Sequence, residues 1–148
     1  MAVVKFFSPE EEARIVGAIR AAEKNTSGEI RVHVEVGADE PALDVAVRIF
    51  RELGMHETAD RNAVLILLEV DRREFAIIGD EGITKVVPKN FYDEERDIMQ
   101  QHFRRGEFAE GIALAIERVG ANLRKFFPYQ SDDVNELPDE ISYGQRKA

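Results

Sequence analysis

The sequence predicts an α/β fold, in which a mixed β-sheet containing a parallel pair and an antiparallel hairpin is sandwiched by α-helices on both faces. Residues 29–36 alternate strictly between polar and apolar side chains, a pattern typical of a half-buried strand. Residues 63–69 and 74–79 are apolar runs separated by the polar pair Asp71 and Arg72, which indicates a hairpin. Helical patterns between and after these strands provide the covering layers.

The helices are predicted from their start and stop signals. Ser8 and Glu11 form a capping box around a proline, so a helix begins there and continues to about Lys24. A second helix begins at Pro41 and ends at Gly54, which supplies the left-handed residue after the last turn. Further helical segments are expected as a short turn over 83–88 and as longer helices over about 92–105 and 107–127.

The chain is expected to form one domain followed by a tail. Its 148 residues and 16.8 kDa are enough to bury a core without disulfides, and we place the domain at residues 1–128. Residues 129–148 are acidic and contain few apolar side chains, which predicts a flexible tail. Leu137 and Ile141 stand among acids there, so a short docking segment is the open alternative.

Composition excludes several functions. A net charge of -9 and a pI near 4.9 argue against nucleic acid and anionic membranes, and favour a divalent cation or a basic protein partner. The absence of cysteine excludes thiolate chemistry, and the histidines His33, His56 and His102 lack zinc spacing and are expected at the surface. No run approaches the ~20 apolar residues that span a bilayer. We therefore expect a cytoplasmic monomer without membrane insertion.

The candidate site lies at the open end of the hairpin. If Glu69 faces Glu74, the register places Asn62 opposite Glu81 and Ala63 opposite Asp80. A parallel crossover from strand 30–36 to strand 63–69 brings the start of the first strand to the same edge. Gathered oxygen ligands suggest calcium, although a polar turn with a positive φ at Gly82 is the alternative. The candidate metal ligands are Asp60, Asn62, Asp80 and Glu81, with Glu29 as an accessory.

Several motifs together resemble the TPM domain, found in a thylakoid-lumen phosphatase-like protein, a photosystem II repair factor and a levamisole-receptor modulator. Residues 27–30 open the first strand, residues 62–65 stand where the family often has Asn-Gly-Val-Leu, and residues 79–83 match its glycine-rich turn. Phe103-x-x-Gly106-x-Phe108-x-x-Gly111 matches the pattern between its last helices. The chain departs from the family at Ala63, where glycine is usual, and its tail resembles that of short bacterial members without an anchor.

The resemblance implies a mixed sheet flanked by helices, calcium in acidic loops, and acid phosphatase activity in some members. Three functions therefore compete. A calcium-binding module that acts as a binding or chaperone-like protein, in stress or membrane-protein maintenance, ranks first, and its protein partner is unknown. A metal-dependent acid phosphatase ranks second, because no nucleophile motif and no arginine placed to receive an anion is visible. A structural subunit of a complex ranks third.

Overall fold

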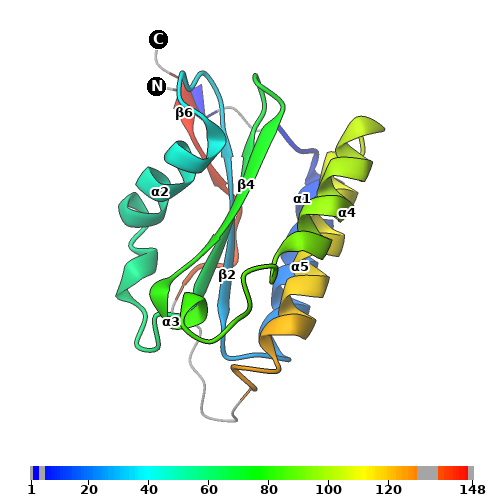
Figure 1. The fold of residues 1–148 in the computed structure, drawn as a ribbon. Helices are drawn as coiled ribbons and strands as arrows, with labels where there is room; N and C mark the ends of the chain where they lie inside the picture. The colour runs from blue at the N-terminus through cyan, green and yellow to red at the C-terminus, as the bar shows by residue number, and fades with distance from the viewer. Residues whose placement is uncertain (1, 4–5, 130–136, 147–148) are drawn as a thin grey trace.

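The structure is a computed structural model that describes residues 2–3, 6–129 and 137–146. Its centre is a four-stranded mixed sheet in the order β4-β3-β2-β5 (Figure 1). The two inner strands run parallel, and β4 pairs antiparallel with β3, as the sequence predicts. The strands are β2 (Glu29–Glu35), β3 (Ala63–Glu69), β4 (Glu74–Gly79) and β5 (Ser142–Tyr143), and a separate antiparallel pair joins β1 (Ala2–Val3) to β6 (Gln145–Arg146).

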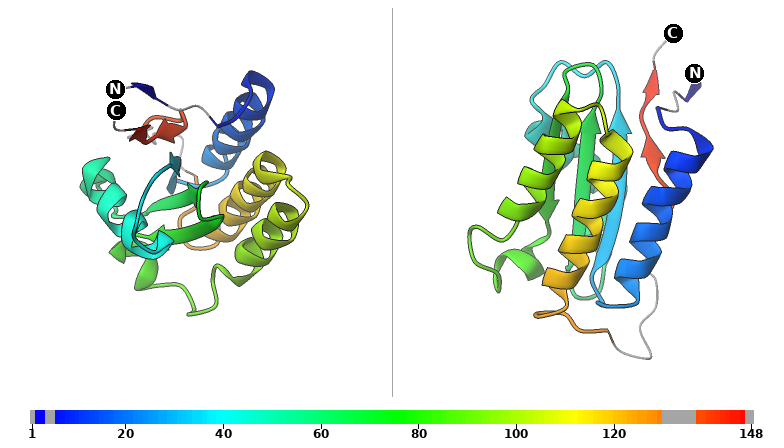
Figure 2. Two further views of the ribbon diagram at one scale, coloured as in Figure 1. Left: turned by 90° about the horizontal axis from the view of Figure 1, so that it is seen from above. Right: turned by 90° about the vertical axis from the view of Figure 1, so that its right-hand side faces the viewer.

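Helices cover both faces of the sheet, which confirms the predicted fold class. The helices α1, α4 and α5 lie on one face and α2 lies on the other (Figure 2). Two short elements, a 3-10 turn after α2 and the helix α3 after β4, stand near the open end of the hairpin. The bounds are α1 (Pro9–Glu23), α2 (Ala42–Glu52), the turn Met55–Glu57, α3 (Glu81–Thr84), α4 (Asp93–Arg104) and α5 (Phe108–Leu123). No helix in the described part of the chain is long and apolar enough to cross a membrane.

The hairpin has the predicted register, with Glu69 opposite Glu74. The amide of Arg73 donates to the carbonyl of Val70 at 3.2 Å, and Arg73 takes a left-handed φ of 53°. The strand β3 is buried at every position because it is central in the sheet and covered on both faces. Its alternate side chains therefore join two cores, one beneath α1, α4 and α5 and one beneath α2.

The strand β2 is more deeply buried than its alternation predicts. Glu29, His33 and Glu35 lie on the polar side of the pattern, yet all three are buried. The prediction that His33 lies at the surface is wrong, because Ser142 of β5 and Glu35 bind its ring. These three polar side chains of β2 are therefore buried and do not face solvent, whereas Arg31 on the same side of the pattern is partly exposed.

The C-terminal segment lies on the domain, which differs from the flexible tail expected from composition. Ser142 and Tyr143 pair in parallel with β2, and the Tyr143 hydroxyl donates to Glu12 of α1 at 3.0 Å. Leu137 joins the core beneath α2 and Ile141 joins the core beneath α1, so each buries its apolar side chain. Residues 130–136 of the expected tail lie outside the described residues.

Candidate functional site

The hairpin end, defined here as residues 60–62 and 80–82, brings together part of the predicted acidic site. Asp80 follows β4 and caps α3, and its Oδ1 accepts a hydrogen bond from the amide of Glu81 at 2.8 Å. The amide of Gly82 donates to the carbonyl of Arg61 at 2.9 Å, which ties the loop before β3 to α3. Gly82 is helical, so the expected positive φ falls instead on Arg61, at 51°.

Arg61 binds two of the carboxylates that the sequence predicts as metal ligands. Its Nε lies 2.6 Å from Oδ2 of Asp80, and its Nη2 lies 2.8 Å from Oδ1 of the same carboxylate. A third nitrogen, Nη1, reaches Oε1 of Glu81 at 3.2 Å. The hydrogen bond with Asp80 raises the pKa of Arg61, so the guanidinium stays charged. A bidentate arginine pair of this kind fixes both side chains in one geometry.

The other predicted ligands are placed differently. Asn62 is buried, and its side-chain amide donates to the carbonyl of Ser27 at 3.3 Å. Asp60 is exposed, while its backbone carbonyl lies against Gly82. Within the described residues, no three Asp, Glu or His side chains are placed to hold one metal ion. The metal ligand set stays a prediction: Asp80 and Glu81 are joined through Arg61, and the amide of Glu29 donates to the carbonyl of Asn62 at 3.3 Å.

Glu29 belongs to a second group of carboxylates, which sequence analysis missed. Glu23 at the end of α1 interacts with both Glu29 and Asp139, and burial together with the hydrogen bond to Asp139 raises the pKa of Glu23 to about 9. Glu23 is therefore protonated at neutral pH, when it donates to a neighbouring carboxylate. The Nε of Arg20 lies 3.5 Å from Oδ2 of Asp139. These contacts join α1, β2 and the C-terminal segment.

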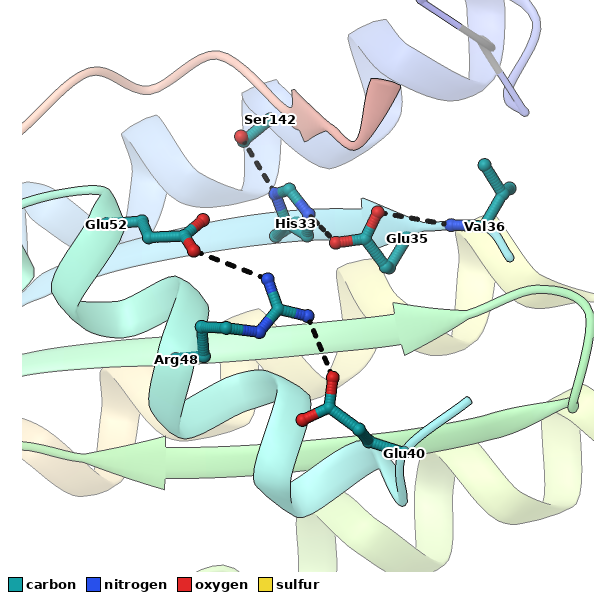
Figure 3. A network of polar contacts seen from close by, with 7 residues as sticks. All are labelled: His33, Glu35, Val36, Glu40, Arg48, Glu52 and Ser142. Atoms are coloured by element: carbon teal, nitrogen blue, oxygen red, sulfur yellow. Dashed lines mark hydrogen bonds and ion pairs between the residues drawn. The ribbon is translucent and has the colours of Figure 1, made fainter. Parts of the chain in front are cut away.

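A buried network joins β2 to β5 (Figure 3). Nδ1 of His33 lies 2.8 Å from Oγ of Ser142, and Nε2 lies 3.3 Å from Oε2 of Glu35. Burial lowers the pKa of His33, so its ring is neutral. Because a carboxylate only accepts, we assign the proton to Nε2, and Nδ1 then accepts from the Ser142 hydroxyl. His33 is only 3% exposed, so we interpret the network as the attachment of β5.

A pocket of about 150 Å³ lies between α2 and the end of β4, next to Asp80. We call it the α2–β4 pocket. Sequence analysis expected His56 at the surface, and the structure places it, partly exposed, in the lining of this pocket. It missed Arg51, which has no motif and reaches the pocket only because α2 packs across β4. The lining consists of Val47, Phe50, Arg51, His56, Arg61, Ile78, Gly79 and Asp80.

Comparisons with known proteins agree with this architecture. The chain is similar to the BA42 protein from the psychrophilic bacterium Bizionia argentinensis, with 45% identity and a TM-score of 0.90, and the alignment covers 97% of this chain and 99% of that chain. The N-terminal domain of a P. gingivalis protein has 24% identity and a TM-score of 0.68, covering 82% of this chain and 78% of that chain. At that identity the likeness shows the fold alone.

A third structure, the N-terminal domain of the cg2496 protein from Corynebacterium glutamicum, shares the fold at 14% identity and a TM-score of 0.62, covering 97% of this chain and 84% of that chain. No curated protein matches the sequence. The TPM domain matches over residues 3–122, which include all of the hairpin end and the α2–β4 pocket. The chain therefore belongs to the TPM domain family.

Proposed function

We propose that the chain is a binding module whose hairpin end responds to a divalent cation such as calcium. The observation that carries this proposal is the ion pair of Arg61 with Asp80 and Glu81, because an internal cation already neutralises two carboxylates there. Calcium competes with Arg61 for these oxygens. The backbone carbonyl of Asp60 lies against Gly82 and offers a further oxygen.

The affinity expected for calcium is low. Calcium takes about six to eight oxygens, so water must complete a shell that begins with two carboxylates and a carbonyl. The guanidinium must also leave before the ion can enter. Such a site responds to high calcium concentrations and does not hold the ion permanently.

The surface supports binding in preference to catalysis. Leu43 and Val47 lie one turn apart on α2 and are 56% and 53% exposed. Exposed apolar side chains grouped in this way indicate a contact surface for another protein. Val47 lines the α2–β4 pocket next to Asp80, whereas Leu43 lines a separate hollow with Arg73, Glu74 and Phe75 near the hairpin turn.

A calcium titration followed by amide chemical shifts tests the proposal. Residues 56–62 and 79–83 should shift first in the wild type, and Asp80→Asn should abolish the response. Arg61→Gln should tighten calcium binding by about fivefold, the scale at which exposed ion pairs compete. Arg124→Gln is the matched control, because it removes the same charge from an exposed position at the end of α5.

The proposal fails if neither segment responds in the wild type or in Arg61→Gln at millimolar calcium. It also fails if Arg61→Gln and Arg124→Gln bind calcium equally, because competition by Arg61 would then be absent. A general effect of net charge would move both variants together.

A metal-dependent acid phosphatase is the second candidate. One observation favours it: Arg51 and His56 line one pocket with Asp80, and Arg51, which forms no ion pair in the described residues, is an anion-receiving group that the sequence did not reveal. Membership of the TPM domain family supports both candidates, since the resemblance implies calcium and, in some members, acid phosphatase activity. Turnover of p-nitrophenyl phosphate, with and without calcium, should be measured on the wild type and on Asp80→Ala. Metal-dependent turnover lost in the variant would establish the phosphatase, and calcium binding without turnover supports the binding module.

A further inference from the structure

We propose that the α2–β4 pocket binds the C-terminal carboxylate of a peptide that ends in aliphatic residues. The last side chain lies against the apolar part of the pocket, and the carboxylate lies against Arg51 and His56. This inference goes beyond the proposed function and does not require a bound cation. It rests on the charge of the lining, on the size of the pocket and on the surface next to it.

The polar side of the pocket matches a single negative charge. Arg61 is paired with Asp80, which lines the pocket, and with Glu81, which does not, so Arg51 is the positive charge that these pairs leave in the lining. Within the described residues, Arg51 forms no ion pair and its side chain no hydrogen bond. His56 lies beside Arg51 in the lining, with its Nε2 3.8 Å from Oε1 of Glu57 and its Nδ1 buried without a hydrogen-bond partner in the described residues. One unpaired guanidinium suits a carboxylate, whereas a phosphate dianion would leave a negative charge uncompensated.

The apolar side of the pocket is suited to one side chain. Phe50 is 7% exposed, and Val47, one of the most exposed apolar residues of the chain at 53%, stands at the rim. A volume of about 150 Å³ is well below the ~300 Å³ at which pockets for drug-sized ligands begin. It accommodates one aliphatic side chain with its carboxylate, so the remainder of the ligand must lie outside.

The surface beside the pocket favours a peptide over a small free acid. Leu43 lies one turn before Val47 on α2 and is 56% exposed; it lines not the pocket but the adjoining hollow with Arg73, Glu74 and Phe75. A peptide that enters by its C-terminus can place its preceding aliphatic residue on Leu43. A free acid that fits the pocket would leave this side chain uncovered. Burial of both Leu43 and Val47 therefore requires a ligand that continues beyond its last residue.

The test compares acetyl-Ala-Leu-Leu carrying a free carboxylate with the same peptide as its C-terminal amide, by calorimetry and amide shifts in EDTA without divalent cations. The acid should bind and shift Val47, Arg51 and Ile78, and the amide should not bind measurably. Arg51→Gln should weaken binding about tenfold, the scale of one charge-assisted hydrogen bond. Arg48→Gln is the matched control, since Arg48 lies on the same helix, pairs with Glu40 and Glu52, and does not line the pocket.

Four results would overturn the proposal. Equal binding of acid and amide would show that the carboxylate is not recognised, and equal loss in Arg51→Gln and Arg48→Gln would show that the pocket is not the site. If acetyl-leucine binds as tightly as the tripeptide, the ligand of the pocket is a small acid and not a peptide. If inorganic phosphate binds more tightly than the peptide and displaces it, the pocket is a phosphate site. Because the experiment contains no calcium and leaves Arg61 intact, its failure is distinct from failure of the cation proposal.

Discussion

Replacement of Glu23 by glutamine should stabilise the protein at alkaline pH. Burial and the hydrogen bond to Asp139 raise the pKa of Glu23 from 4.5 to about 9. The folded protein therefore keeps a proton on Glu23 between these values, while the unfolded chain has released it. The stabilising contribution is complete below about pH 4.5 and is lost progressively as the pH rises towards 9.

The magnitude follows from the pKa and the exposure of the side chain. A rise from 4.5 to about 9 would correspond to at most about 6 kcal/mol, at about 1.4 kcal/mol per pH unit. Glu23 is only half-buried, so water screens part of its interaction with Glu29 and Asp139. We therefore expect the free energy of unfolding of the wild type to fall by about 1–3 kcal/mol across this window because of Glu23.

Urea unfolding followed by circular dichroism, at intervals from pH 4.5 to 9 and constant ionic strength, measures this effect. Glu23→Gln keeps a donor for Asp139 but has no proton to lose. It should match the wild type near pH 4.5 and exceed it by about 1–3 kcal/mol at pH 8. Asp97→Asn is the control, because Asp97 is an exposed carboxylate on α4. If the wild type and Glu23→Gln give parallel curves across the whole range, the carboxyl cluster does not share a proton and the reasoning is refuted.

Local signals in the sequence were sufficient for most of the fold. The capping box forms as predicted, with the amide of Glu11 donating to Oγ of Ser8 at 3.2 Å and the amide of Ser8 donating to Oε1 of Glu11 at 2.9 Å. Gly54 takes the left-handed φ of 69° that ends its helix. The polar pair Asp71 and Arg72 stands at the centre of the hairpin turn. Each feature depends on residues close in sequence, so a short pattern determines it.

The strand β5 could not be predicted in the same way. It has only two residues, and its partner β2 lies more than a hundred positions earlier in the chain. Leu137 and Ile141 were the available signal, but two apolar residues among acids are equally typical of a disordered segment. Their placement depends on the two cores that bury them and on the polar layer of β2, where Nδ1 of His33 lies 2.8 Å from Oγ of Ser142. That layer is visible only once the sheet is assembled.

The sequence predicted where the hairpin end lies but not which side chains contact one another there. The register brings Asp80 and Glu81 to the loop before β3, as the antiparallel pairing requires. A sequence pattern gives charges but not the direction of side chains. The sequence prediction therefore gave no role to Arg61, which lies between Asp60 and Asn62. In the structure Arg61 has a left-handed backbone, and its side chain binds Asp80. The acid that shares a proton, Glu23, was missed because its partners come from distant elements.

Three further substitutions test the local packing. Gly82→Ala should destabilise the fold by about 1–3 kcal/mol, because a Cβ there overlaps backbone carbonyls of the loop before β3. Gly17→Ala in α1 meets no atom within 4 Å and should stabilise by up to about 1 kcal/mol, so equal effects in urea unfolding would contradict this interpretation. Ser142→Ala removes the donor 2.8 Å from Nδ1 of His33 and leaves a buried nitrogen without a partner, at a cost of about 1–3 kcal/mol. Among the strands that the structure describes, β5 pairs with β2 alone, so the loss should appear as local opening, with faster hydrogen exchange at the Gly144 amide and unchanged exchange in β3. Unchanged exchange at Gly144 would show that β5 is held by its apolar neighbours and not by the histidine network.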